Sequence, residues 1–514
     1  TAEATDGFYR LSFDNLSISF FKGELTLEGI KLCPDSAVFR DWERKDSLPS
    51  VYVTAEVGMV DFKGLNLTWR RSYKQLHFDS FEIRNPDIQV FNPYYSTRAE
   101  VKERKEAEIK TLYEVVSPYI NVLTVRILNL ENASVSYSVE NPVSPIVYAL
   151  NDVSFHAYGF RLDENSSESG KLLYCDNFDF ITKRSQTLLA NNDFRLQTDR
   201  ILLSTEDSII SISNITLTPQ GELWGEQKKR PDSYLNALIR AIEVKGIQFR
   251  RENALNYLTA RSLDIISSDI QAFNLAGESL PSAKKTEKKS LNEAEADSLV
   301  RSLSLYELIS PVLHTVSIGT VGIGQAKLQY SFAVKDKIEV YKLANFDFQA
   351  NDFRIDSVSE TQRGFWYSRG FSFEATGIEG LMTARNHRFT VKRMTLDTES
   401  GDFNLERIRL YPLSVCGQND YMAGSIDTVG IRGLLYDKGI SARLLKIDRP
   451  NLRYVLFSSF NKKDVKSVKP ANSRVGVESI LNPFLRYFSV KRLSLNHAYV
   501  TIDDKSMSDP VTYK

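Results

Sequence analysis

The sequence predicts a mainly β fold with a few helices: repeated antiparallel β-units that form an elongated, curled sheet or groove, each copy opened by a helix. Three observations lead to this fold class. A long segment of the chain is duplicated, apolar and polar residues alternate over much of its length, and a stretch with helical spacing precedes each copy. The composition, with 42% hydrophobic and 25% charged residues, is that of a folded chain.

The duplication begins at residues 112–118, LYEVVSP, which return as LYELISP at 305–311, an offset of 193 residues. This offset holds without slippage as far as residue 219, and a short motif does not keep register over such a distance. The matching pairs include Tyr148 and Tyr341, Phe155 and Phe348, Asp163 and Asp356, Phe178 and Phe371, Ile215 and Ile408, and Pro219 and Pro412.

Two further matches extend the repeat towards both ends of the chain. A third copy opens near Pro483, with Val500 on Leu328 and Ile502 on Tyr330, and residues 81–90 resemble 445–454. We therefore expect four segments: a partial β-unit at 1–98, a helix plus a first repeat unit at 99–290, a helix plus a second repeat unit at 291–473, and the truncated start of a third unit at 474–514.

Strands are predicted wherever apolar residues take every second position, because this period places them on one face of a sheet. After each predicted helix such runs occupy 125–139, 318–334 and 490–502. In 210–219 and 403–412 one extra residue interrupts the alternation, so that two residues instead of one separate two apolar positions. Each run ends at a proline. The extra residue predicts a bulge or a tight link between strands, and the proline ends the ladder by removing a donor.

Helices are predicted at 97–119, 291–313 and 474–488, where a polar start leads to apolar residues at helical spacing. Each of these helices is expected to pack only through its C-terminal half. A shorter helix is predicted at 232–242. The Lys-rich segment 279–290 is predicted to be a flexible linker.

The sequence contains no pattern for catalysis, a metal or a cofactor, so we expect a protein that is not an enzyme. The five histidines occupy unrelated repeat positions, and neither a nucleophile elbow nor a Walker loop occurs. Gly319, Gly322 and Gly324 have no glycine counterparts in the first copy, which favours a bulged strand over a phosphate cradle. Three distant cysteines predict buried or idle thiols.

The charge balance and the hydropathy limit the partners. Lys plus Arg and Asp plus Glu both number 65, so the zero net charge gives no reason to expect nucleic acid as a partner. The sequence has no run of about 18 apolar residues that would predict a bilayer span. Thr1 is not an initiator residue, which leaves a removed signal or membrane anchor as an open alternative.

The long apolar faces leave two architectures open. Two sheets could close on each other as a sandwich, or one sheet could stay open and curl, with a continuous apolar trough on its inner face. Stacked repeats extend a sheet along one axis more naturally than they close it, which favours the trough. The candidate lipid-groove residues are Val135, Tyr137, Phe155, Phe178, Leu328, Tyr330, Phe348, Phe371, Val500 and Ile502.

The openings GFYRLSF at 7–13 and GELTLEGI at 23–30, with the recurring phrases at 83–90 and 125–137, resemble the AsmA-like family of bacterial envelope proteins, relatives of TamB and of the bridge-like lipid-transfer proteins. The resemblance covers most of the chain and is one of pattern. It implies an elongated β-groove in the periplasm that holds lipid acyl chains between two membranes. It also implies an inner-membrane anchor ahead of the opening.

The resemblance further implies a non-enzymatic protein that holds or conducts phospholipid or another lipid, or supports outer-membrane assembly, with envelope proteins as further partners. Acyl chains would partition onto the apolar face at about 25 cal/mol per Å² of area kept from water. The alternative is a structural or scaffold β-repeat protein of the cell envelope with closed, packed sheets. Co-purifying lipid would distinguish the two.

Overall fold

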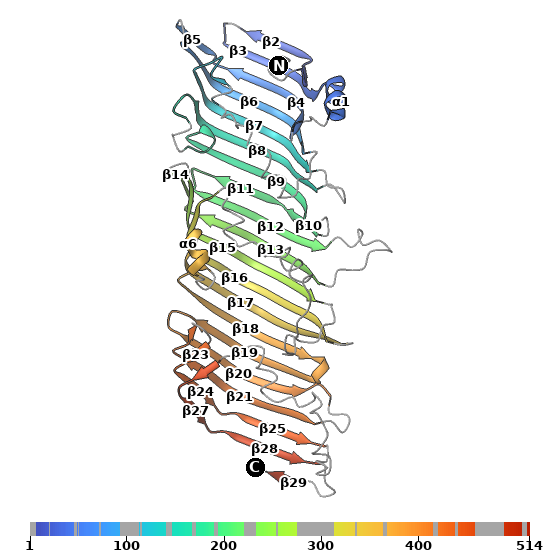
Figure 1. Cartoon of the computed structure of the whole chain (residues 1–514), viewed down its shortest axis with the longest axis vertical. Coiled ribbons are helices and arrows are strands. Elements are labelled where there is room, and N and C mark those ends of the chain that lie inside the picture. The colour runs from blue at the N-terminus through green and yellow to red at the C-terminus, as the bar shows by residue number, and fades with distance from the viewer. Residues whose placement is uncertain are drawn as a thin grey trace. The chain divides into compact units, whose positions relative to one another are not determined.

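The computed structural model of the chain describes residues 7–19, 21–45, 49, 51–70, 73–92, 113, 116–139, 146–166, 171–189, 194–219, 233–252, 255–274, 313–334, 337–362, 367–414, 420–436, 440–457, 488–505 and 511–513. Most of these residues are in strands (Figure 1). Twenty-six described strands belong to one mixed sheet that is not closed on itself, and three form a second, small sheet. The predicted mainly β, curled-sheet class is confirmed.

The elements are as follows. The first strands are β1 (Tyr9–Ser12), β2 (Asn15–Ser19), β3 (Glu24–Pro34), β4 (Tyr52–Lys63), β5 (Asn66–Arg70), β6 (Tyr73–Asn92), β7 (Val122–Val139), β8 (Ile146–Leu162), β9 (Asn177–Leu189), β10 (Phe194–Thr198), β11 (Arg200–Ser204), β12 (Ile209–Pro219), β13 (Ser233–Lys245), β14 (Gln248–Glu252) and β15 (Leu255–Asn274). The later strands are β16 (Thr315–Val334), β17 (Lys337–Ile355), β18 (Gly370–Met382), β19 (His387–Asp397), β20 (Asp402–Pro412), β21 (Tyr421–Arg432), β22 (Leu435–Tyr436), β23 (Ile440–Ala442), β24 (Leu444–Asp448), β25 (Asn451–Leu456), β26 (Phe488–Val490), β27 (Leu493–Asn496), β28 (Tyr499–Asp504) and β29 (Val511–Tyr513). The helical elements are α1 (Ser36–Arg44), α6 (Ser357–Gln362) and the 3-10 turns η2 (Leu172–Tyr174) and η5 (Thr383–Arg385).

The chain forms two compact units. The first consists of Thr1–Arg230, Ala237–Asp264 and Ile309–Ser317, and the second contains the remaining residues. The predicted segment boundaries near residues 98, 290 and 473 lie outside the described residues and stay predictions.

In the first unit, β3 pairs antiparallel with β1, β2 and β4, and β4 pairs with β6. The strands β6 and β7 then run parallel, and β7, β8 and β9 alternate in direction. The short strands β10 and β11 both pair with β9 and β12, so two short strands take the place of one long one.

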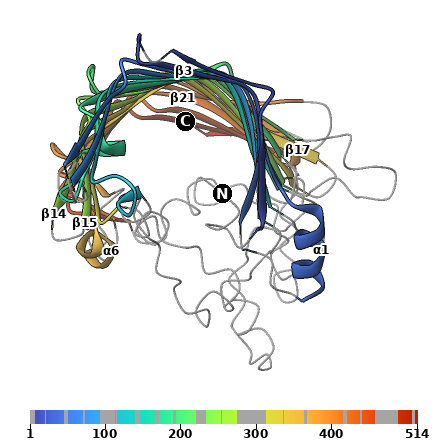
Figure 2. The ribbon, with the colours of Figure 1, turned by 90° about the horizontal axis from the view of Figure 1, so that it is seen from above.

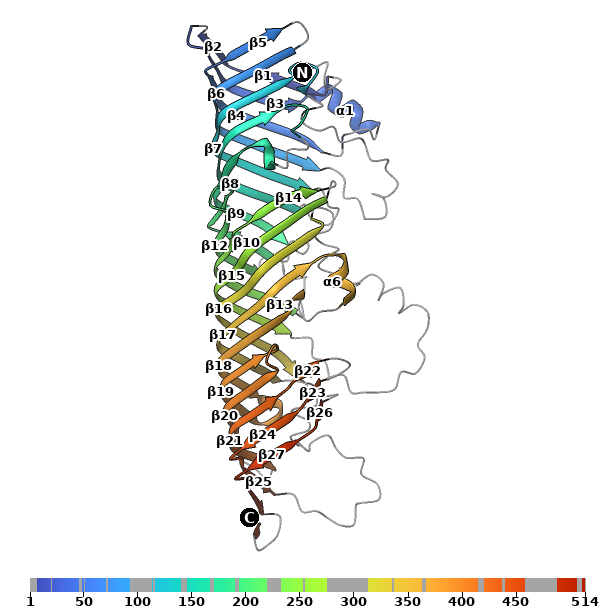
Figure 3. The ribbon, with the colours of Figure 1, turned by 90° about the vertical axis from the view of Figure 1, so that its left-hand side faces the viewer.

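In the second unit, β17 to β21 form an antiparallel meander. The strand β21 pairs with β24 and β25, which in turn pair in parallel with β27 and β28. This parallel step repeats the step from β6 to β7, and the segments 81–90 and 445–454 that resemble each other in sequence stand before it in the two units. Figure 2 shows that the strands within each unit bend along their length, and Figure 3 shows their common tilt within each unit.

A row of residues with positive φ crosses the strands where two-residue steps were predicted. Asn214 in β12 has φ of 50° and Arg407 in β20 has φ of 51°. The predicted tight link between strands is wrong, because each strand continues through this residue. The residue adds one position to the alternation, so Ile212 and Ile215 lie on the same face despite their odd spacing.

Residues with positive φ also occur in the neighbouring strands. The residues with φ between 50° and 62° in the first unit include Gly29 of β3, Asn85 of β6, Asn132 of β7 and Asp152 of β8. Asn132 Nδ2 donates to Asn85 Oδ1 at 3.4 Å, so the row is linked between β6 and β7. The following residues Ala133 and Val153 are buried. The row therefore keeps the apolar side chains on one face across the unit.

The duplication is confirmed in three dimensions. The ring centroids of Phe155 and Phe178 lie 5.5 Å apart, and those of Phe348 and Phe371 lie 5.6 Å apart. Positive φ values also recur at the same offset, at Asn132 and Gln325, Gly401 and Ser208, Tyr174 and Tyr367, and Asn214 and Arg407. The chain therefore repeats its backbone conformation as well as its residue pattern.

The helix predicted at 232–242 is wrong, since these residues lie in or beside β13. Leu, Ala and Arg favour helices, but Ile239 and Ile242 pair with Ile215 and Ile212 of β12 and extend the apolar face. Packing within the sheet overrides local propensity here.

The other predicted helices lie almost wholly outside the described residues. The exception is a single turn at the end of 97–119, in which Ser117 N donates to Tyr113 O at 2.7 Å. Helix α1 was not predicted. It begins after Asp35, whose carboxylate accepts from Ala37 N at 2.9 Å and caps the first turn.

Candidate functional site: the apolar face

One face of the sheet is apolar in each unit. The register of β7 and β8 places directly opposite one another the pairs Val125 and Phe160, Leu128 and Ala157, Leu130 and Phe155, and Val135 and Leu150. These side chains are buried or half-buried, whereas Arg126 and Asn132 on the other face are exposed. Side chains converge on the concave side of a bent sheet and spread apart on the convex side. We therefore infer that the apolar face is the concave one.

Two candidates of the first unit line the open part of this face. Val135 pairs with Leu150 and Tyr137 pairs with Tyr148. Val135 and Tyr137 are half-buried, and Tyr148 is 42% exposed. The phenol rings of Tyr137 and Tyr148 lie 6.1 Å apart, which makes a broad, partly wet aromatic surface.

The other two candidates of the first unit lie where the chain covers its own sheet. Phe178 is 7% exposed and forms a buried cluster with Ala157 and Cys175, the residue that follows η2. Phe155 packs against this cluster and is half-buried. Burial raises the pKa of the Cys175 thiol to about 11. Phe178 is thus covered by protein and does not face an open groove.

The second unit holds four of its six candidates in the same way, with Leu328 and Tyr330 on β16, Phe348 on β17 and Phe371 on β18. Tyr330 is 39% exposed and stacks on Phe332, at a ring distance of 5.4 Å. Phe332 stacks in turn on Tyr341 at 5.6 Å. Phe371 is only 8% exposed, like its counterpart Phe178.

Val500 and Ile502 are exposed candidates near the end of the chain. They lie on β28 and pair in parallel with Leu452 and Tyr454 of β25. Val500 is 49% exposed and Ile502 is 37% exposed. All ten candidates therefore lie on the apolar face of their unit, but they differ widely in how open they are.

Hydroxyl groups interrupt the apolar face of the first unit on β9 and β10. Thr182 Oγ1 donates to Asn151 O at 2.9 Å, and Ser185 Oγ lies 2.5 Å from Thr198 Oγ1. The second copy has Ala375, Ile378 and Val391 at the positions of these three hydroxyls. Because the hydroxyls bond within the protein, they do not demand polar partners from a ligand.

The second unit has a buried polar cluster near the start of β17. Glu339 is 2% exposed; its Oε2 accepts from the Tyr341 hydroxyl at 3.4 Å, and its Oε1 has no partner among the described residues. Burial raises the pKa of Glu339, and burial together with the Glu339 charge raises the pKa of Tyr341 to about 12. His387 is also buried, with Nδ1 2.6 Å from Arg385 O and Nε2 3.1 Å from Met422 O.

These polar groups were not among the predicted site residues. The first copy has Ile146 and Phe194 at the positions of Glu339 and His387. A position-by-position comparison of the two copies would have identified these polar groups. An acid and a histidine stand in the second copy where the first copy has apolar residues.

Neither a metal-binding cluster nor a membrane-spanning helix is found in the described part of the chain. No group of His, Cys, Asp and Glu in that part of the chain is arranged to hold a metal ion. Of the helices that the structure describes, none has the length and apolar character needed to cross a bilayer.

Neither a protein-family model nor a curated protein matches the chain. The class of protein is therefore defined by its architecture alone. It is a mainly β repeat protein with an open, bent sheet and a one-sided apolar face in each unit. The resemblance to the AsmA-like family stays a prediction.

Proposed function

We propose that this chain is a non-enzymatic protein of the cell envelope whose apolar face forms a groove that holds or conducts lipid acyl chains between membranes, or supports outer-membrane assembly. The observation that carries the proposal is the one-sided apolar face in both units. Half-exposed side chains such as Tyr137, Tyr330 and Val500 have no second layer of described strands against them. Extended apolar surface of this kind is a usual mark of a binding site.

The chemistry of the face suits an alkyl chain better than a small polar ligand. Its side chains are mainly aliphatic and aromatic, and the hydroxyls of Thr182, Ser185 and Thr198 are already bonded. An acyl chain kept from water there gains about 25 cal/mol per Å². Because no single contact fixes the position of the acyl chain, the acyl chain is free to slide along the apolar face.

The location and the further partners rest on the family resemblance. We propose a periplasmic protein held at the inner membrane of a Gram-negative bacterium by a segment outside this sequence. Phospholipid is the proposed ligand, and envelope proteins are the proposed protein partners.

Site-specific photo-crosslinking tests the groove directly. A photoreactive phenylalanine analogue at Val135 or Leu328 faces the groove, and the same analogue at Ser136 or Gln329 is the matched control on the opposite face. After expression in a Gram-negative host, we expect lipid adducts by mass spectrometry at the first pair of positions only. Equal labelling of both faces, or no adduct at either, would overturn the proposal.

The burial of Phe178 and Phe371 favours a second candidate, a scaffold whose apolar face is filled by its own chain. In that case protein extracted without detergent would carry no lipid. A stoichiometric amount of co-purifying phospholipid supports the groove, and its absence supports the scaffold.

A further inference from the structure

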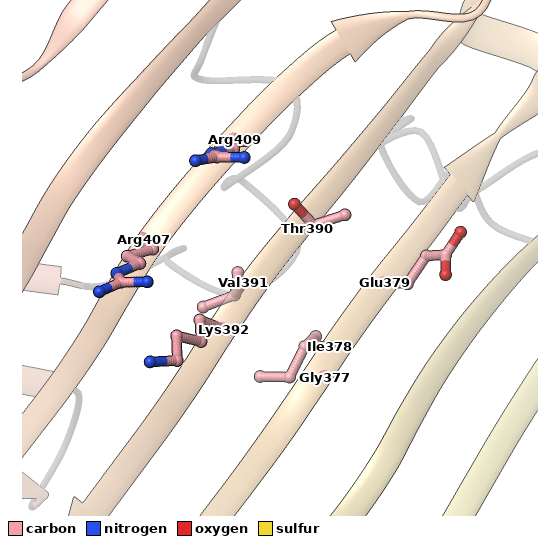
Figure 4. A pocket seen from close by; sticks show the side chains of 8 residues that line it. All are labelled: Gly377, Ile378, Glu379, Thr390, Val391, Lys392, Arg407 and Arg409. Atoms are coloured by element: carbon pink, nitrogen blue, oxygen red, sulfur yellow. The ribbon is translucent and has the colours of Figure 1, made fainter.

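The second unit has a hollow on its sheet. Its charged lining residues alternate with side chains of the apolar face, and Ile378 and Val391 of that face also line it. It has a volume of about 330 Å³ and spans β18, β19 and β20. Figure 4 shows Arg407 and Arg409 on β20, Lys392 on β19 and Glu379 on β18 around it. We call it the basic hollow. Its size is that of a small-ligand site.

The positive charges of the basic hollow are not neutralised within the described residues. No carboxylate there pairs with Lys392, Arg407 or Arg409. The one acidic lining residue, Glu379, is occupied by Arg388 at 2.8 Å. The three cations therefore face the hollow without a counter-charge.

Two further carboxylates near the basic hollow, Glu406 on β20 itself and Asp427 on β21, lie against other arginines. Glu406 lies 3.7 Å from Arg393, which is bound more closely by Glu374 at 2.8 Å. Asp427 pairs with Arg449 at 2.7 Å. Neither carboxylate forms an ion pair with Lys392, Arg407 or Arg409, although both line the adjoining hollow with the two arginines.

The first copy shows that the fold does not require these cations. Asp199 and Asn214 stand at the positions of Lys392 and Arg407, and Asn214 Nδ2 donates to Asp199 Oδ2 at 2.8 Å. In the second copy, two cations stand at the positions of this hydrogen-bonded Asp–Asn pair. Thr216 stands at the position of Arg409.

Arg407 occupies one of the positive-φ positions that keep the apolar face aligned. Its φ of 51° belongs to the left-handed region, which Gly and Asn adopt more easily than Arg. Such a conformation costs about 1 kcal/mol or more for a residue other than Gly. Asn214 of the first copy meets the same backbone requirement, so the fold does not require a cation at this position.

We propose that the basic hollow binds a phosphate group, either on a soluble phosphate ester or on an anionic phospholipid headgroup. Two arginines offer paired donors to phosphate oxygens, and the lysine adds a point charge. The cations lie on the face opposite the proposed acyl-chain groove. The phosphate site can therefore be tested independently of the proposed function.

The test uses the full chain and the variant Arg407→Asn with Lys392→Asp, which restores the residues of the first copy. Binding of inorganic phosphate and glycerol 3-phosphate is measured by titration calorimetry. Flotation with phosphatidylcholine vesicles, with and without phosphatidic acid, tests the headgroup. Arg184→Asn is the control, since it removes an exposed cation from the same face of the first unit.

We expect saturable binding by the unsubstituted chain and by Arg184→Asn, and a loss of at least about tenfold in affinity for the double variant. Binding of the soluble phosphates identifies an ester as the ligand, whereas binding only to vesicles with phosphatidic acid identifies a headgroup. The proposal is overturned if the unsubstituted chain binds none of these probes, or if the double variant, folded by circular dichroism, binds as tightly.

Discussion

Asp163 and Asp356 hold the same turn in the two copies, since each accepts a hydrogen bond at 2.6 Å from the arginine two residues before it. Each also accepts the hydroxyl of the serine three residues later, at 3.0 Å and 2.8 Å. Both carboxylates are 8% exposed. These turns end β8 and β17, so they fix where the chain leaves the sheet in each copy.

Asp356→Asn is expected to destabilise the second unit. Burial alone would raise the pKa of Asp356, but hydrogen bonds from the backbone and hydroxyl of Ser359 and from Arg354 outweigh it and lower the pKa to about 2. The carboxylate therefore stabilises the fold above about pH 4, and this contribution is lost as the pH falls towards 2. At pH 7 the variant should lose about 2 kcal/mol in free energy of unfolding, measured by urea denaturation.

The control for this prediction is Asp87→Asn, which changes an exposed carboxylate in β6. It should leave the denaturation midpoint nearly unchanged. An equal loss in both variants, or an unchanged dependence on pH in Asp356→Asn, contradicts the assigned role.

Glu339→Ile is expected to stabilise the second unit at neutral pH. Burial raises the pKa of Glu339, so the folded state holds this proton more strongly than the unfolded chain does. Its effect is most favourable below the unfolded pKa of about 4.3, and stability falls as the pH rises through the higher folded value. Isoleucine, the residue of the first copy, removes the unpaired oxygen and should add about 1–3 kcal/mol.

Thermal unfolding at pH 5 and pH 8 measures the effect of Glu339→Ile. The gain should be larger at pH 8. Glu374→Gln is the comparison, because it removes a paired carboxylate and should destabilise. A gain that is independent of pH would show that Glu339 is charged throughout the range.

Gly380 and Phe389 are expected to be energetically coupled. They pair across β18 and β19, and a Cβ on Gly380 would collide with the Phe389 ring. The first copy has Thr187 opposite Leu196 at these positions. Gly380→Thr should therefore cost about 1–3 kcal/mol, and adding Phe389→Leu should recover about 1 kcal/mol of it. A double-mutant cycle by denaturation checks this, and strictly additive effects would rule the coupling out.

Cys33 is expected to react with iodoacetamide much faster than Cys175. Cys33 is exposed, whereas Cys175 is 4% exposed and burial raises the pKa of its thiol to about 11. Since the thiolate is the nucleophile, the rate at pH 8 should differ by about 100-fold or more. Peptide mass spectrometry gives both rates, and equal rates in the native protein would mean that the segment after η2 opens freely.

The repeat and the apolar face could be predicted because both depend on periodicity. The two-residue alternation predicted which side chains share a face within a unit, and the offset of 193 residues carried Phe155 and Phe178 correctly onto Phe348 and Phe371. Periodicity also failed once, at 232–242, where good helix formers lie in β13 because their neighbours in the sheet are apolar.

The finer features could not be predicted from single residues. Arg407 and Gln325 are not residue types that indicate positive φ. The sequence therefore predicts an extra residue in the strand but not the row of positive φ values that keeps the apolar face aligned. The low exposure of Phe178 depends on packing against Cys175, at the end of the irregular segment just before β9, and no periodic pattern predicts that contact. The basic hollow is made of ordinary outward-facing cations, and only their counterparts in the first copy make them conspicuous.

The row of positive φ values bears on how such a chain could grow. Because Asn132 and Asn214 reset the alternation within their own strands, each strand orients its side chains without help from a neighbour. A duplicated stretch of gene inherits this orientation intact, and its new strands need only an edge to pair with. Lengthening by tandem duplication then requires no compensating mutations, and individual copies are free to diverge in the few positions that bind something different.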